Sequence, residues 1–225
     1  MRSIAAVSLL LCSFMQNGAA AAAPSFQGFT KLLYDRSNFE VQADGSATET
    51  REWAITVLAE QGIASANRTT IEHSAELQTA EITSAYTLKA DGRRIDAPPA
   101  NFQVSSDSGR GEAAPMFSDI QSQSVVFPDV AVGDTVVFAY RRVDKQPMFP
   151  GHFSYARGFS KFEIIDELSI RITAPRSLAL KVLARGVEGG PKAADGGRQR
   201  WEWRYHNTEL AQPEPGAVSA FDQGP

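Results

Sequence analysis

Cysteine is nearly absent from this sequence of 225 residues, which contains only Cys12. That residue lies in an apolar run, residues 4–14, which follows the basic start Met1-Arg2 and precedes the small residues 18–23. A basic tip, a short apolar run and an Ala-x-Ala exit are typical of a cleavable secretory signal, so we assign residues 1–23 to a signal peptide. Leu11 stands directly before Cys12, where lipid attachment requires a small residue, and this argues against a lipoprotein. The mature chain is therefore expected to have no disulfide and no cysteine nucleophile.

Long hydrophobic runs are missing as well. The apolar part of the signal is roughly half of the ~20 residues that a helix needs to cross a bilayer, and no second run of that kind occurs. We therefore expect an exported chain, periplasmic or secreted, without a membrane span once mature. The formal net charge of −4 provides no basic surface for nucleic acid or anionic lipid, so neither is expected as a partner.

Histidine is scarce too, and the three that occur are His73, His152 and His206. They form no His-Glu-x-x-His pair, and metal sites usually cluster His, Cys and carboxylates, so we predict no metal and no other cofactor. The sequence contains no Gly-x-Ser-x-Gly nucleophile elbow and no glycine-rich loop between a strand and a helix. The paired carboxylates Asp166-Glu167 are interpreted as a solvated strand end. No catalytic residue is assigned, although a serine hydrolase whose triad assembles only in space stays open.

The sequence does contain segments in which apolar residues alternate with polar or small ones, with a period of two. Apolar residues alternate with polar or small ones at Phe39-Glu40-Val41, at Trp53, Ile55 and Val57, and in several later segments. The pattern indicates strands with one buried face, and turn residues separate about ten such segments, as in an all-β sandwich or barrel. We expect one β domain over residues 24–211. The proline-containing tail, residues 212–225, has the composition of a linker.

Two Asp-Gly pairs predict hairpins of different kinds. Asp44-Gly45 is expected in a three-residue loop with its glycine in the left-handed conformation, because that register places the apolar side chains of both flanking strands on one face. Asp91-Gly92 is expected in a two-residue turn, which would place Leu88 opposite Ile95. The same dipeptide thus predicts different loops, and the apolar pattern decides between them.

Three further segments are assigned by pattern. Residues 52–66 contain helix formers, but the alternation at their start favours a strand, and no long helix is expected anywhere. Residues 178–182 continue the alternation of the strand before them and are also assigned to a strand. Residues 98–114 hold paired prolines and runs of serine and glycine, which predict one long mobile loop.

The aromatic strand around Trp201 and Trp203 is a candidate binding surface. If exposed, these rings would form a stacking platform for sugar rings or for a partner protein. If buried, they belong to the core, which the alternation with Glu202 and Arg204 favours.

Two loop segments, Met116-Phe117 and Met148-Phe149, carry apolar residues that strand periodicity cannot explain. They either plug one end of the sandwich or form a docking patch on its surface. Both interpretations stay open.

Several segments, taken together, resemble one known family. They follow one another in the expected order along nearly the whole mature chain: Glu49-Thr50-Arg51-Glu52, Glu60-Gln61-Gly62-Ile63, Leu77-Gln78-Thr79, Ala85-Tyr86-Thr87-Leu88-Lys89-Ala90-Asp91-Gly92-Arg93-Arg94-Ile95, Pro115-Met116-Phe117-Ser118-Asp119, Val126-Phe127-Pro128-Asp129-Val130, Val132-Gly133-Asp134-Thr135 and Phe149-Pro150-Gly151-His152-Phe153. The sequence is similar to the family catalogued as domain of unknown function 3857.

In that family the domain is an immunoglobulin-like antiparallel β-sandwich of bacterial exported proteins. It normally precedes a transglutaminase-like core with a Cys-His-Asp catalytic set. The resemblance therefore implies such a sandwich, of about ten strands, here without the transglutaminase-like core. Because the mature chain has no cysteine, no catalytic residue can be carried over.

Three functions follow as hypotheses. The leading one is a non-catalytic exported accessory module that docks on, positions or regulates a transglutaminase-like or cysteine-peptidase-like domain or partner. The alternative is a carbohydrate- or cell-wall-binding module with glycan as its partner, and the third is a cryptic hydrolase built around one of the histidines. The candidate binding residues are Met116, Phe117, Met148, Phe149, Trp201 and Trp203.

Overall fold

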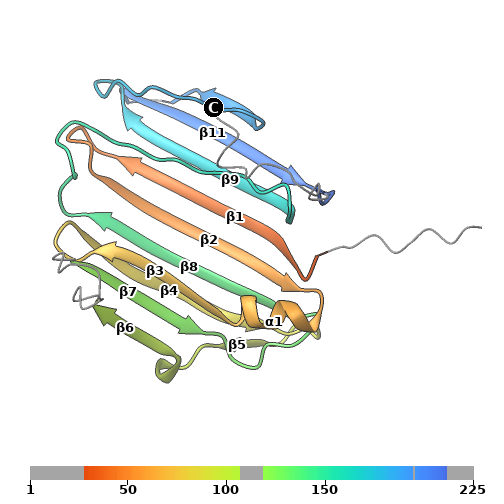
Figure 1. The fold of residues 1–225 in the computed structure, drawn as a ribbon. Coiled ribbons are helices and arrows are strands. Elements are labelled where there is room, and N and C mark those ends of the chain that lie inside the picture. Colours follow the sequence, from red (N-terminus) through yellow and green to blue (C-terminus); the bar gives the residue numbers. More distant parts are fainter. Residues whose placement is uncertain (1–27, 107–118, 195, 212–225) are drawn as a thin grey trace, which may run out of the picture.

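The computed structural model describes residues 28–106, 119–194 and 196–211 (Figure 1). These residues form eleven β-strands, one α-helix and one short 3₁₀ helix, with the strands in two sheets. The prediction of an all-β, sandwich-like fold is confirmed. The predicted signal peptide, the predicted linker and the pair Met116-Phe117 all lie outside the described residues. Within the described part of the chain, no helix is long and apolar enough to cross a membrane.

The larger sheet has eight strands in the order β10-β11-β9-β1-β2-β8-β4-β5, and the smaller has three in the order β3-β7-β6. The strands of the larger sheet are β1 Thr30–Val41, β2 Ala47–Val57, β4 Gln78–Leu88, β5 Arg94–Asp96, β8 Thr135–Asp144, β9 Ile164–Pro175, β10 Glu188–Lys192 and β11 Arg198–Asn207. Those of the smaller sheet are β3 Arg68–Ser74, β6 Phe102–Ser106 and β7 Ile120–Val126. The helix α1 spans Glu60–Ala66 and the 3₁₀ helix Pro99–Asn101.

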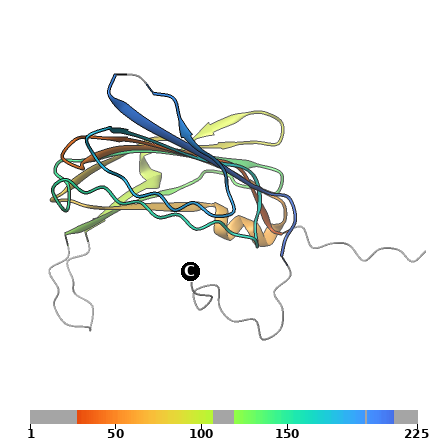
Figure 2. The ribbon, with the colours of Figure 1, turned by 90° about the horizontal axis from the view of Figure 1, so that it is seen from above.

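The smaller sheet covers only one part of the larger sheet, as a second layer (Figure 2). There Ile71 of β3 and Val125 of β7 pack with Phe138 of β8 in one buried apolar cluster. A second cluster, which includes Phe39 of β1 and Ile170 of β9, lies on the part that the smaller sheet leaves uncovered. Irregular segments, residues 145–163 and 176–187, supply some of the partly buried side chains that pack on this second cluster, namely Phe153, Tyr155, Phe159 and Leu180. The two clusters lie on the same face of the larger sheet, called the inner face below.

One strand pair departs from the expected antiparallel arrangement, because β1 and β9 are parallel. The β1–β2 hairpin stands between β8 and β9 in the sheet, so the chain must cross it after β8. Residues 145–163, the crossing segment, make this passage over the inner face and return the chain to the end of the sheet where β8 began. Parallel strands require such a crossover connection. The long irregular cover on the second cluster is thus a consequence of the strand order.

The register of the β1–β2 hairpin confirms the prediction. The Gln42 amide donates to the Ser46 carbonyl at 2.8 Å, which closes a three-residue loop, and Gly45 has a φ of 92°. Glycine suits this left-handed conformation because it has no Cβ. Phe39 and Trp53 consequently share the inner face.

The expected two-residue turn at Asp91-Gly92 is wrong. Leu88 pairs with Arg94 rather than with Ile95, so the loop again has three residues, 90–92. A two-residue turn of the Asp-Gly type needs a positive φ at both central positions. Only Gly92 has one, at 88°, whereas Asp91 keeps an ordinary φ. Both hairpins therefore use the same kind of loop.

The strand assignment of residues 52–66 holds only up to Val57, because Glu60–Ala66 form helix α1. The helix packs directly on the chain that enters β1. A Cβ on Gly62 would lie 2.3 Å from the Phe29 carbonyl oxygen, so only glycine permits this approach. The alternation ends where the chain leaves the sheet, and the helix formers then determine the local structure.

Two other local assignments are also corrected. Residues 178–182 form no strand, although Leu178 is buried and Leu180 packs on the second cluster. These residues face the core from an irregular segment, which alternation alone cannot distinguish from a strand. Within the predicted loop 98–114, β6 pairs with β7 as an exposed edge strand, and residues 107–114 lie outside the described part.

Candidate functional site

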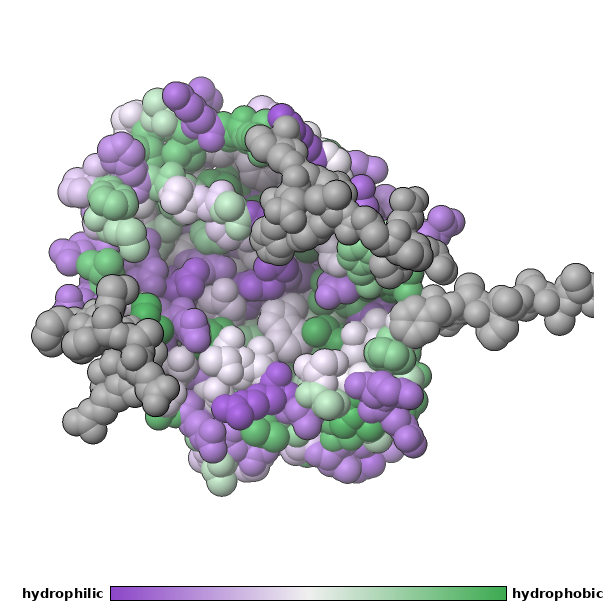
Figure 3. Space-filling model, viewed as in Figure 1, coloured by the Kyte–Doolittle hydropathy of each residue, from purple (hydrophilic) through white to green (hydrophobic). Residues whose placement is uncertain are grey.

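The inner face of the larger sheet carries buried charges between its two apolar clusters. Figure 3, drawn from the same side as Figure 1, shows hydrophilic residues gathered in a hollow across the middle of the molecule. Asp35 of β1, 3% exposed, accepts two hydrogen bonds from Arg51 of β2, at 2.8 and 2.6 Å. Arg157 of the crossing segment donates a third, at 2.6 Å. These charge-assisted bonds hold the crossing segment to the sheet.

A second buried carboxylate, Glu49 of β2, lies beside this group at 5% exposure. It accepts hydrogen bonds from the Tyr140 hydroxyl at 2.8 Å and from Arg142 at 2.5 Å, both on β8. Burial, together with the charge of Glu49, raises the pKa of Tyr140 to about 12, so the hydroxyl remains a donor at neutral pH. Burial by itself would lower the pKa of Arg51, but its bonds to Asp35 hold that pKa above its usual range. Tyr140 and Arg51 therefore stay protonated at neutral pH, which suits structural bonding rather than proton transfer.

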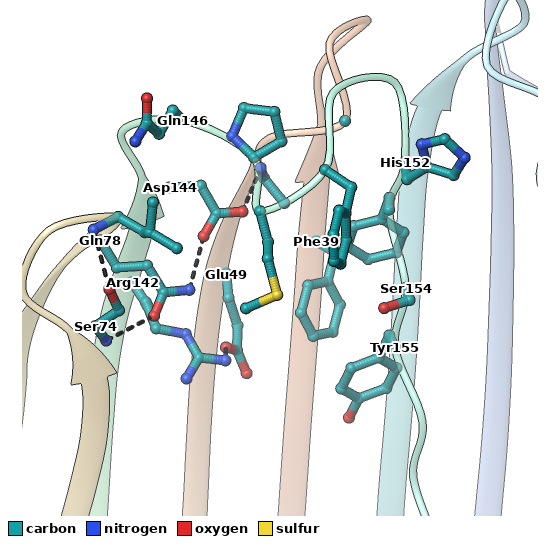
Figure 4. A pocket seen from close by; sticks show the side chains of 17 residues that line it. Phe39, Glu49, Ser74, Gln78, Arg142, Asp144, Gln146, His152, Ser154 and Tyr155 are labelled. Carbon is teal, nitrogen blue, oxygen red and sulfur yellow. Dashed lines mark hydrogen bonds and ion pairs between the residues drawn. The ribbon is translucent and has the colours of Figure 1, made fainter. Parts of the chain in front are cut away.

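A pocket of about 260 Å³ opens beside this network, at the end of the sheet where the β1–β2 hairpin turns. Figure 4 shows Arg142 directed toward Glu49, while His152 points away from the other labelled side chains. Asp144 accepts hydrogen bonds from the Ala47 amide and from the Gln78 side chain, both at 2.8 Å. It thereby joins the starts of β2 and β4 to the end of β8. Both carboxylates that line this pocket are occupied by structural bonds.

The rim of this pocket is formed by residues 147–152, which we call the end turn. The Gly151 amide donates to the Asp44 carbonyl at 2.6 Å, so the end turn is bound to the β1–β2 loop. A Cβ on Gly45 would lie 2.5 Å from the His152 carbonyl oxygen, which shows how closely the two loops pack.

The end turn presents two of the candidate binding residues to solvent. Met148 is 72% exposed and Phe149 is 65% exposed. Both line the rim of the pocket, but they do not plug the end of the sandwich. Their exposure argues against the plug interpretation for these two residues, and the docking-patch interpretation stays a prediction.

Trp201 and Trp203 lie on the inner face, on β11, where they pair with Ile172 and Ile170 of β9. Trp201 is only 9% exposed and belongs to the second apolar cluster, while Trp203 is partly buried against it. The alternation with Glu202 indicated such burial, and the structure bears this out. The two rings do not form an open stacking platform for sugars, because one of them is core.

The described histidines do not assemble a catalytic cluster. His152 bonds through Nδ1 to the Pro150 carbonyl, at 2.9 Å, and His73 Nδ1 is buried with no partner. Burial, and the nearby cations Arg142 and Lys145, lower the pKa of His73. Among the described residues, no hydrogen bond joins a histidine to a serine or a carboxylate, and no three potential ligands gather where a metal could bind. The cryptic hydrolase therefore has no observation in its favour here.

The buried charge network is the feature that reasoning from sequence missed. A signal was available, because the register that places Phe39 and Trp53 inward also places Glu49 and Arg51 inward. Charged residues at inward positions of a strand indicate a paired interior network. Arg157 gave no such signal, since it comes from an irregular segment whose path the strand pattern does not define.

The sequence and the described fold match one family. The model of the family described as "Domain of Unknown Function with solved-structure structure" (DUF3857) matches residues 43–211. The chain therefore belongs to this family, as its sequence motifs indicated. A comparison with curated proteins gave no match.

Among solved structures, the chain is similar to a proposed protease from Parabacteroides distasonis, with a TM-score of 0.70 and 19% identity. The match covers 85% of this chain and 39% of that one, so this chain spans well under half the length of its structural relative. At this identity the likeness concerns the fold alone.

Two further matches are much weaker. An M1 zinc metallopeptidase from Deinococcus radiodurans has a TM-score of 0.36 and 10% identity, over 79% of this chain and 39% of that one. A family 3a carbohydrate-binding module from Clostridium thermocellum has a TM-score of 0.29 and 11% identity, over 58% of this chain and 88% of that one. Similarities of this size carry no argument about this chain.

Proposed function

We propose that this chain is a non-catalytic accessory domain that docks on and positions a transglutaminase-like or cysteine-peptidase-like catalytic domain. Membership of the DUF3857 family supports this proposal, because the resemblance described above implies a domain that normally precedes such a core. The structural relative supports it too, because there the shared fold occupies 39% of a longer protein. The buried carboxylates Asp35 and Glu49 of the inner face form structural bonds, so we place the docking function on the surface.

The observation that carries the proposal is the end turn. Its backbone is bound to the β1–β2 loop through Gly151 and Asp44, so the backbone that carries its apolar side chains is ordered before any partner arrives. Burying Met148 and Phe149 against a partner would contribute about 1.5–3 kcal/mol for each fully covered side chain. Because the end turn is already ordered, little of this binding free energy is lost to immobilising the turn on binding.

The test measures binding between the purified mature chain and purified transglutaminase-like proteins encoded in the same genome. By titration calorimetry, we expect M148S/F149S to weaken binding at least ~30-fold, which corresponds to about 2 kcal/mol. The matched control is V104S/V132S, which removes exposed apolar side chains far from the end turn and should leave the affinity unchanged. Equal affinities for the wild type and M148S/F149S would rule out docking through the end turn.

We also propose that the protein works outside the cytoplasm after removal of residues 1–23. The basic start, short apolar run and alanine-rich exit support this location. Mass spectrometry of the protein from periplasmic and cytoplasmic fractions tests it. We expect a periplasmic product whose first residue lies near Pro24, whereas an uncleaved cytoplasmic product would contradict the proposal.

A further inference from the structure

A second and larger cavity lies on the inner face, on the opposite side of the buried charges from the smaller sheet. It has a volume of about 560 Å³, well within the range of sites that hold small ligands. The inner face of β9 and β11 forms one wall, the crossing segment another, and residues 180–187 a third. The cavity therefore lies between the sheet and the two irregular segments that replace a second sheet layer here.

The walls of this cavity are mainly apolar. Ile170 and Ile172 of β9 lie beside Trp203 and Trp201 of β11 on the sheet wall, and Phe159 of the crossing segment also lines the cavity. Tryptophan rings provide a large flat apolar surface on which an alkyl chain or an aromatic ring can lie. The two tryptophans, which do not form an open platform, thus line the sheet wall of a half-open cavity.

The charged residues that line the cavity are all cations. Arg157, Lys181 and Arg185 contribute to the lining, and no aspartate or glutamate is among the described lining residues. Arg157 is neutralised by Asp35, at 2.6 Å. By contrast, Lys181 and Arg185 form no ion pair with any carboxylate in the described part of the chain. An apolar cavity thus has two uncompensated positive charges along one wall.

The wall that carries these cations also exposes apolar side chains. Val182 is 46% exposed and Leu183 is 77% exposed, although they lie within a few residues of buried core. Residues 181–185 belong to neither a helix nor a strand. Exposed apolar residues of this kind, next to an apolar cavity, commonly indicate a binding site.

We propose that this cavity binds a small anionic amphiphile, in which an apolar chain or ring carries one acidic head group. The apolar body lies against Trp203 and Ile170, and the head group lies near Lys181 and Arg185. The charge pattern selects this class, because an uncharged apolar ligand would leave both cations unused and a cationic one would be repelled. The site is separate from the end turn, so the proposal does not depend on the docking function.

The test compares three ligands that share one alkyl chain, namely decanoate, decan-1-ol and decyltrimethylammonium, each below its micelle concentration. We expect titration calorimetry to show saturable binding in the order decanoate, decanol, decyltrimethylammonium, with decanoate about tenfold tighter than the alcohol. Decyl phosphate in a fourth titration distinguishes a carboxylate head group from a phosphate one. A terminally brominated decanoate should quench tryptophan fluorescence, and W203F should reduce the quenching.

The variant K181Q/R185Q locates the head group. Both side chains are exposed, so the variant should fold with an unchanged melting temperature, and its affinity for decanoate should fall about fivefold to tenfold toward that of the alcohol. The matched control, K192Q/R200Q, removes the same pair of residue types from β10 and β11 outside the cavity, and should bind like the wild type. Absence of saturable binding, equal affinity for decyltrimethylammonium, or unchanged decanoate binding in K181Q/R185Q would each overturn the proposal.

Discussion

The close packing between the end turn and the β1–β2 loop leads to a sharp prediction about Gly45. An alanine there would have to keep a φ of 92°, and its Cβ would lie 2.5 Å from the His152 carbonyl oxygen and 2.7 Å from the His152 nitrogen. A Cβ in this backbone region costs about 1–2 kcal/mol. The loops must also separate, which breaks the hydrogen bond from Gly151 to Asp44 and costs about 0.5–1.5 kcal/mol more.

The chain supplies its own control for this substitution. Gly92 occupies the same position in the same kind of loop, with a φ of 88°, but nothing lies within 4 Å of the Cβ that an alanine would add. G92A should therefore show the backbone cost alone, about 1–2 kcal/mol. G45A should reduce the free energy of unfolding by about 1.5–3.5 kcal/mol, because the contact with the end turn adds to that cost.

Equilibrium unfolding in urea, followed by tryptophan fluorescence and by circular dichroism, measures both values under the two-state assumption. G45A should also weaken binding of the proposed partner, since it displaces Met148 and Phe149, and G92A should not. Equal losses of stability in the two variants would show that the end turn is not bound as described, and would remove the basis for a fixed docking surface.

Three other predictions follow from the buried polar groups. D35N should lower the unfolding free energy by about 3–5 kcal/mol because two arginines lose their shared carboxylate, whereas D96N on the surface should have no measurable effect in the same urea titration. Because the pKa of His73 is lowered in the fold, the unfolded chain binds a proton more readily, so stability should fall as pH drops below about 6.5, and H73L should reduce this dependence in urea titrations at several pH values. Because the pKa of Tyr140 is raised to about 12, the unfolded chain ionises first on the alkaline side, so stability should fall above about pH 10, and less steeply in Y140F.

The sequence predicted the strands and their inward faces well, because alternation reports directly on burial. The β1–β2 register followed from the need to keep Phe39, Val41, Trp53 and Ile55 on one face. The prediction for the second hairpin was wrong for a local reason. A two-residue turn requires a positive φ at Asp91, and the apolar pattern on which the prediction rested does not report on that φ. Helix α1 was missed because a segment of seven residues is too short to show a helical period.

The candidate site was less predictable, because its walls come from segments without periodicity. Met148 and Phe149 were identified by exclusion, as apolar residues that no strand explained, and their exposure agrees with that reasoning. Trp203 was identified as well, but its role as a cavity wall depends on where residues 180–187 run. The crossing segment follows from the strand order, and no local pattern in the sequence specifies that order.

The parallel pairing of β1 and β9 has a consequence for how the chain folds. Synthesis delivers β1 and β2 early, and their hairpin can form from local contacts, but the partner of Phe39 on the other edge is Ile172, which is synthesised much later. Until β9 arrives, β1 presents a long unpaired edge, and such edges pair readily with other molecules. Contacts between segments far apart in sequence also form slowly. We expect the vulnerable stage of folding to be this late closure of β9 onto β1, with intermolecular strand pairing as its characteristic failure.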